Sequence, residues 1–103
     1  MRKRQKGADR AIAAFRTFAL CQASGVWDMD IRDETAVRCV LGVLSDADEE
    51  AVRAIYMASP SEHLTHGKIS LRVKRYAIDA FVDESMVYRR LKRARKLFEH
   101  ARG

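Results

Sequence analysis

The closing stretch of the chain, DESMVYRRLKRARKLFEHARG (residues 83–103), combines dense positive charge with an apolar repeat. Six of the eight residues from Arg89 to Lys96 are basic. Apolar side chains recur through the same stretch at steps of three or four, namely Val87, Leu91, Ala94 and Phe98. On a helix of about 100° per residue the last three fall within about 40° of Val87. The opposite side carries Ser85, Arg89, Lys92 and Lys96. This segregation predicts a folded amphipathic helix with an outward cationic side.

The rest of the chain predicts further helices and no strands. Apolar residues recur at helical spacing over residues 8–24, 33–44, 45–59 and 70–80. The chain has only 5 Gly and 1 Pro, which favours a few long helices over many short elements. Short polar residues that begin helices stand before these segments: Asp33 or Thr35, Ser45 or Asp46, and Asp83. Val26 and Trp27, in the first connecting loop, are expected to pack on the core. We therefore predict an all-α fold of about five helices.

The 103 residues are predicted to form one domain. We predict a flexible basic tail over residues 1–7 and an N-terminal pair of helices over residues 8–44. We predict a DNA-binding unit over residues 45–103. Within that unit the last two helices are separated by three or four residues. This connection is typical of a helix-turn-helix.

Charge is distributed unevenly along the chain, whose net charge is +6. Residues 7–67 hold five basic and ten acidic side chains, whereas residues 68–103 hold eleven basic and four acidic ones. Residues 1–6 add four basic side chains and no acid. An acidic middle between basic ends predicts a polyanionic partner for the basic part of the chain.

The last helix has the features of a DNA-reading helix. Its start carries Glu84 and Ser85, small or polar side chains that can approach base edges. Its later turns carry basic side chains suited to phosphates. The preceding helix adds Lys68, Arg72, Lys74 and Arg75 as further candidates for backbone contact.

The segment YAIDAFVDESMVYRRLKRARKLF (residues 76–98) resembles the helix-turn-helix in region 4 of bacterial RNA polymerase sigma factors and of related phage-type transcriptional regulators. The positions that carry the resemblance are Ala77, Val82, Val87 and Leu91, with ten residues from Ala77 to Val87. LSDADEEAVRAIYM (residues 44–57) is similar to the helix that precedes the motif in those proteins. The likeness spans residues 44–99, and the first half of the chain does not share it. Phe81 stands where those proteins usually have Gly, and Asp83 where Ser is common.

The resemblance implies a stand-alone transcriptional regulator whose last helix enters the major groove of double-stranded DNA. By this resemblance the groove-facing residues are Glu84, Ser85, Tyr88 and Arg89. The backbone contacts would come from Arg72, Lys92, Arg93 and Lys96. The resemblance also implies RNA polymerase as a second partner.

Several alternatives stay open at this point. The acidic middle and basic end could bind a protein partner. The chain could instead resemble the small DNA-binding subunit of a phage packaging machine. It could also form a homodimer. RNA or an anionic membrane surface could replace DNA, and the segment MRKRQK (residues 1–6) could act as a minor-groove arm.

Enzymatic and metal-dependent functions are not predicted. The histidines and the two cysteines lack the spacing of a zinc site. The segment DMDIRDE (residues 28–34) lacks the glycine of a calcium loop. No nucleophile or phosphate-binding loop is recognisable in the sequence. We expect no cofactor. The chain has no apolar run of about 20 residues, and we expect a cytoplasmic protein without membrane contact.

Overall fold

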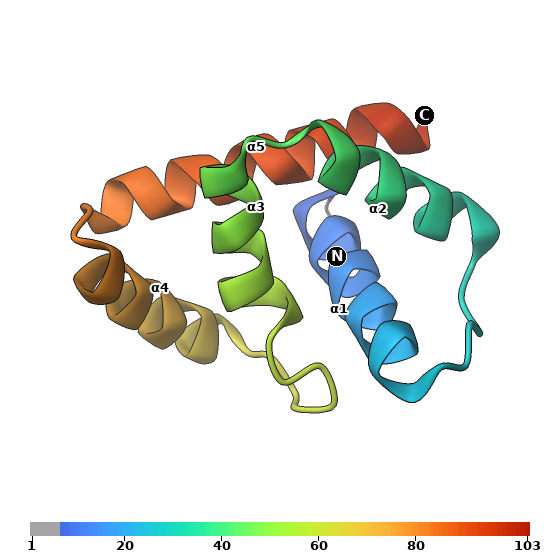
Figure 1. The fold of residues 1–103 in the computed structure, drawn as a ribbon, viewed down its shortest axis with the longest axis horizontal. Coiled ribbons are helices and arrows are strands. Elements are labelled where there is room, and N and C mark those ends of the chain that lie inside the picture. The colour runs from blue at the N-terminus through green and yellow to red at the C-terminus, as the bar shows by residue number, and fades with distance from the viewer. Residues whose placement is uncertain (1–6) are drawn as a thin grey trace, which may run out of the picture.

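The computed structural model describes residues 7–103, and every regular element in that range is helical (Figure 1). The elements are α1 (Gly7–Ser24), α2 (Ile31–Val43), α3 (Asp46–Val52), a π-helical turn η1 (Arg53–Met57) that continues α3, α4 (His66–Ala80) and α5 (Glu84–Arg102). The predicted all-α class with five helices is confirmed. The basic segment 1–6, with its predicted role as a minor-groove arm, lies outside the described residues.

The start of α2 is fixed by Asp30. Its Oδ1 atom accepts hydrogen bonds from the backbone N–H groups of Arg32 (2.8 Å) and Asp33 (3.1 Å). These donors have no partner within the helix itself, so a carboxylate at this position stabilises the first turn. The prediction that Asp33 or Thr35 caps this helix is therefore wrong, and α2 begins two residues before the predicted start.

The starts of α3 and α4 are fixed in the same way by hydroxyl groups. Ser45 Oγ accepts from the N–H of Asp48 at 3.2 Å, in agreement with the prediction. Thr65 Oγ1 accepts from the N–H of Lys68 at 3.2 Å. As a consequence α4 begins four residues before the predicted Ser70.

The π-helical turn η1 directs three successive side chains into the core. Ile55, Tyr56 and Met57 are all buried. In an α-helix three successive side chains spread over about 200°, so one of them would normally face solvent. A π-helical turn contains more residues per turn and narrows this spread. The local change of helix type thus allows a continuous buried run.

Helix α5 packs against α1, α2, α3 and α4. In Figure 1 its first half lies beside α4 and α3, and its second half lies beside α2 and α1. The predicted apolar stripe provides these contacts, because Val87, Leu91, Ala94 and Phe98 are each fully buried. A single long helix thus belongs to the core of both halves of the chain.

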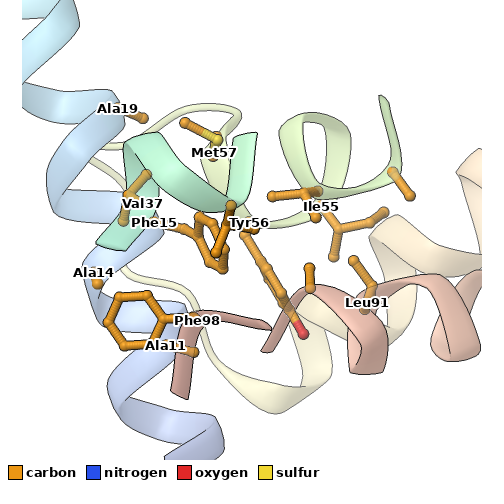
Figure 2. Close-up of a cluster of buried hydrophobic side chains, with 14 of the residues drawn as sticks. Ala11, Ala14, Phe15, Ala19, Val37, Ile55, Tyr56, Met57, Leu91 and Phe98 are labelled. Atoms are coloured by element: carbon orange, nitrogen blue, oxygen red, sulfur yellow. The ribbon is translucent and has the colours of Figure 1, made fainter. Parts of the chain in front are cut away.

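An aromatic cluster joins three elements at the centre of this core (Figure 2). The Phe15 ring of α1 lies 6.1 Å from the Tyr56 ring and 6.0 Å from the Phe98 ring, measured between ring centroids. Figure 2 shows the Tyr56 ring extending toward α5, with its hydroxyl oxygen at the far end. Such pairs add to the free energy gained by burying the rings.

The loop between α1 and α2 corrects one prediction. Val26 is exposed and does not pack on the core. Trp27 is partly exposed, with its ring edge-on to Phe18 at a centroid distance of 5.0 Å. The guanidinium carbon of Arg38 lies 4.8 Å from the Trp27 ring centroid. The indole is thus held between α1 and α2 at the rim of the core.

The connection between α4 and α5 is a turn of three residues, 81–83. Helix α4 ends at Phe81, whose backbone adopts the left-handed conformation (φ 58°, ψ 45°). The N–H of Phe81 donates to the carbonyl of Ile78 (3.3 Å), and the N–H of Val82 donates to that of Ala77 (3.0 Å). This pair of bonds is the Schellman pattern of helix termination. Asp83 occupies the N-cap position of α5, as predicted, but its side chain makes no capping hydrogen bond.

Candidate nucleic-acid interface

The exposed side of α5 carries a row of cations opposite its buried stripe. Arg89, Lys92 and Lys96 are all exposed. Among residues 7–103 these three side chains form no ion pair. We call these three residues the α5 cationic row. Because their charges are not neutralised within the described part of the protein, they are available to an external anion.

The start of α5 is also open to solvent. Glu84, Ser85 and Tyr88, all predicted to face a groove, are exposed. Glu84 lies in the first turn, where a carboxylate interacts favourably with the helix dipole. These side chains adjoin the α5 cationic row, so the structure brings the predicted base-contacting positions and two of the predicted backbone-contacting positions, Lys92 and Lys96, to the exposed surface of one helix.

Arg93, predicted to contact a phosphate, instead pairs with Asp48 of α3. Its Nε donates to Oδ2 at 2.9 Å and its Nη2 to Oδ1 at 2.8 Å. The Asp48 side chain is only 10% exposed, whereas that of Arg93 is 52% exposed. A two-bond pair of this kind holds a guanidinium in a fixed orientation. Arg93 therefore serves the α3–α5 contact, and we remove it from the candidate interface.

The hydrogen bonds from Arg93 lower the pKa of Asp48, and its positive charge adds to this effect while burial opposes it. A carboxylate with a lowered folded-state pKa stabilises the protein above its unfolded pKa, near 3.8, and loses this contribution as pH falls through the folded value. We therefore expect Asp48→Asn to flatten the decline of the unfolding midpoint between about pH 5 and about pH 2. Thermal unfolding of the wild type and of Asp48→Asn across this pH range measures the two midpoints. Midpoints that decline in parallel would contradict a stabilising role for the Asp48–Arg93 pair.

Arg72, also predicted to contact the DNA backbone, is bound to the loop that follows η1. Its Nη1 donates to the carbonyls of Ile55 (2.8 Å) and Ala58 (2.9 Å), and its Nη2 to the carboxylate of Glu62 (3.1 Å). From the other side Arg16 of α1 donates to the carbonyls of Pro60 and Glu62. The Arg72 charge therefore orders this loop, and we remove Arg72 from the candidate interface too.

Two further basic residues of α5 have partners inside the protein. Arg95 Nη1 donates to the Tyr56 hydroxyl at 2.8 Å, and Arg102 Nε donates to the Asp33 carboxylate at 2.6 Å. Burial raises the pKa of Tyr56, so this hydroxyl is protonated at neutral pH. The sequence did not identify these contacts. They show that the basic residues of α5 divide into a structural group and an exposed group.

Helix α4 contributes two exposed cations. The predicted contact Arg75 lies opposite the buried residues Val73 and Ala77, and Lys74 lies at the flank of that buried side. Neither forms an ion pair within the described residues. Lys68 instead lies 3.9 Å from the Glu62 carboxylate. Lys74 and Arg75 are therefore two further exposed cations, on the helix that precedes α5.

Residues 7–103 contain no group of three or more His, Cys, Asp or Glu side chains placed to hold a metal ion. Within the same range, each helix is too short or too polar to cross a bilayer. Cys21 is buried and Cys39 is exposed, and both are free thiols.

Comparison of the chain with protein-family models, with curated proteins and with solved structures gives no match.

Proposed function

We propose that this protein binds double-stranded DNA through the exposed side of α5, as a sequence-specific regulator of bacterial or phage transcription similar to sigma region 4. The observation that carries the proposal is the α5 cationic row, which lies opposite the buried stripe and has no ion pair within the described residues. DNA affinity depends strongly on neutralising phosphates with such side chains.

In the proposed complex α4 and α5 act as a helix-turn-helix. The first turns of α5 would lie in the major groove, where Ser85, Tyr88 and Arg89 reach base edges. Lys92 and Lys96 would contact phosphates farther along the groove wall, and α4 would add Lys74 and Arg75. The core contacts of Val87 and Leu91 hold α5 in a fixed orientation for this docking.

Salt dependence tests whether phosphate contacts dominate binding. If Lys92, Lys96, Lys74 and Arg75 each neutralise one phosphate, log affinity should fall against log salt with a slope of about −3.6. This corresponds to a loss of about 150-fold between ~50 and ~200 mM salt. The measurement is fluorescence anisotropy with a duplex selected from random DNA. A slope near zero would contradict the proposed function.

A comparison of two single variants separates base reading from phosphate contact. Arg89→Ala should weaken binding to the selected duplex by about 10- to 100-fold and relax the preference at one base pair. Lys96→Ala should weaken binding to all duplexes equally. Repeating the selection with each variant measures the difference, and equal, sequence-independent losses would indicate nonspecific binding.

A protein-interaction function is the second candidate, favoured by the outward side of α4. Leu71 and Ile78 are both exposed there, two helical turns apart, with Lys74 and Arg75 between them. An acidic partner with apolar side chains, such as a surface of RNA polymerase, would fit this side. A complex with purified polymerase that forms without DNA and persists at high salt would support it.

Sedimentation of the protein alone would detect the homodimer, or the ring expected of a packaging subunit.

A further inference from the structure

The turn between α4 and α5 contains a residue that its backbone conformation disfavours. Phe81 has a φ of 58°, in the left-handed region. In this region the Cβ atom crowds the following backbone, so helix ends of this type usually have Gly or Asn. A bulky aromatic residue here is an outlier. The two hydrogen bonds of the Schellman pattern use only backbone atoms, so they would form equally well with Gly.

The Phe81 side chain offers no compensating contact within the protein. It is 93% exposed, the highest value among the exposed large apolar residues of the described chain. Its neighbour Val82 packs against the core and supplies the apolar contact that commonly accompanies this helix end. Both the backbone and the ring of Phe81 therefore reduce the stability of the free protein. Strain of this kind, held in place by the surrounding structure, is typical of functional sites.

The position of Phe81 points to the ligand of α5. It precedes the N-cap residue Asp83 by two positions, so their Cα atoms are at most about 7 Å apart. Figure 1 shows this turn at one end of the molecule, where α4 and α5 meet and no other helix covers it. The exposed Ser85 and Arg89 follow directly along α5. A ring extending from this turn can reach the wall of a groove that contains the start of α5.

We propose that Phe81 contacts the DNA and packs its ring against the C5-methyl group of a thymine beside the start of α5. This inference rests on the proposed function. Apolar contact with the thymine methyl is one of the ways in which proteins read the major groove, and an aromatic ring supplies it without a hydrogen bond. Arg89, an exposed cation with no ion pair in the described residues, lies within two helical turns of this end of α5, and its charge favours a nucleic acid over an apolar protein surface as the neighbour of the ring.

The test replaces Phe81 with Gly and with Asn, which both tolerate the left-handed conformation, and with Tyr, which keeps the ring. Gly should raise the thermal unfolding midpoint by about 4 °C, because it removes the strain. The Gly and Asn variants should bind the selected duplex about 5- to 10-fold more weakly, and Tyr should bind like the wild type. Val26→Ser, at another exposed apolar side chain, is the control and should leave binding unchanged.

Duplexes in which uracil replaces thymine identify the contacted methyl group. One such replacement should weaken wild-type binding several-fold and should have no effect on Phe81→Gly. A variant that is more stable but binds DNA as tightly as the wild type would overturn the inference while leaving the proposed function intact, and would assign the ring to a protein partner. An unchanged or lower unfolding midpoint would overturn the strain argument. A wild-type protein that binds no duplex would overturn both proposals.

Discussion

Replacing Arg89, Lys92 and Lys96 together with alanine is expected to weaken duplex binding by at least about 250-fold at ~0.15 M salt, because one base contact and two phosphate contacts are lost. Each phosphate contact contributes about 0.9 to the slope of log affinity against log salt, which at this concentration corresponds to about fivefold in affinity per contact. Loss of the two phosphate contacts of Lys92 and Lys96 should also make the slope less negative by about 1.8. Because the three side chains are exposed and form no ion pair within the described residues, the unfolding midpoint should change little.

A matched variant separates local contact from total charge. Arg10, Arg38 and Arg53 lie on α1, α2 and η1, and replacing all three with alanine changes the net charge by the same amount. This control should lose little affinity, because charges farther than about 8 Å from the phosphates are largely screened at this salt concentration. Equal losses in both triple variants would show that binding depends on overall charge and would remove the argument for α5. Both variants are compared at a temperature where circular dichroism shows that they are folded.

The core could be predicted from the sequence because it depends on periodicity. The stripe Val87, Leu91, Ala94 and Phe98 repeats at helical spacing, and burial follows whenever such a stripe has a partner surface. The start of α2 could not be placed correctly, because Asp30 and Asp33 are both good caps and only the backbone path selects Asp30. The π-helical turn has no sequence signal, since it results from tertiary packing of three buried residues.

The candidate site could be predicted only in part. The residues directly opposite the stripe, such as Lys96, are exposed whatever packs on the other side. Arg93 and Arg95 lie at the flanks of the stripe, about 120° and 80° from Val87, where neighbouring helices decide their environment. A long arginine at such a position reaches acceptors on adjacent elements, here Asp48 and Tyr56. The periodicity of one helix cannot reveal acceptors that belong to another.

The largest loss of stability is expected for Phe98→Ala. The ring is fully buried and lies against Phe15 of α1, so its removal takes away apolar contacts and leaves a cavity between α5 and α1. Truncation of a buried Phe typically costs about 3–5 kcal/mol, while a domain of this size has about 5–15 kcal/mol in total. The neighbouring Leu97 is exposed, and Leu97→Ala should cost less than about 1 kcal/mol. Urea unfolding measures both changes.

The same variant tests whether the chain unfolds as one unit. Trp27, the one tryptophan of the sequence, reports on the α1–α2 end of the molecule, and far-UV circular dichroism reports on all helices. Because α5 packs on every other helix, both signals should shift together in Phe98→Ala. Separate midpoints would show that the two halves unfold independently. At temperatures where it stays folded, Phe98→Ala should bind DNA like the wild type, since the start of α5 is held by Val87 and Leu91. A large loss of affinity in the folded variant would mean that binding requires the second half of α5.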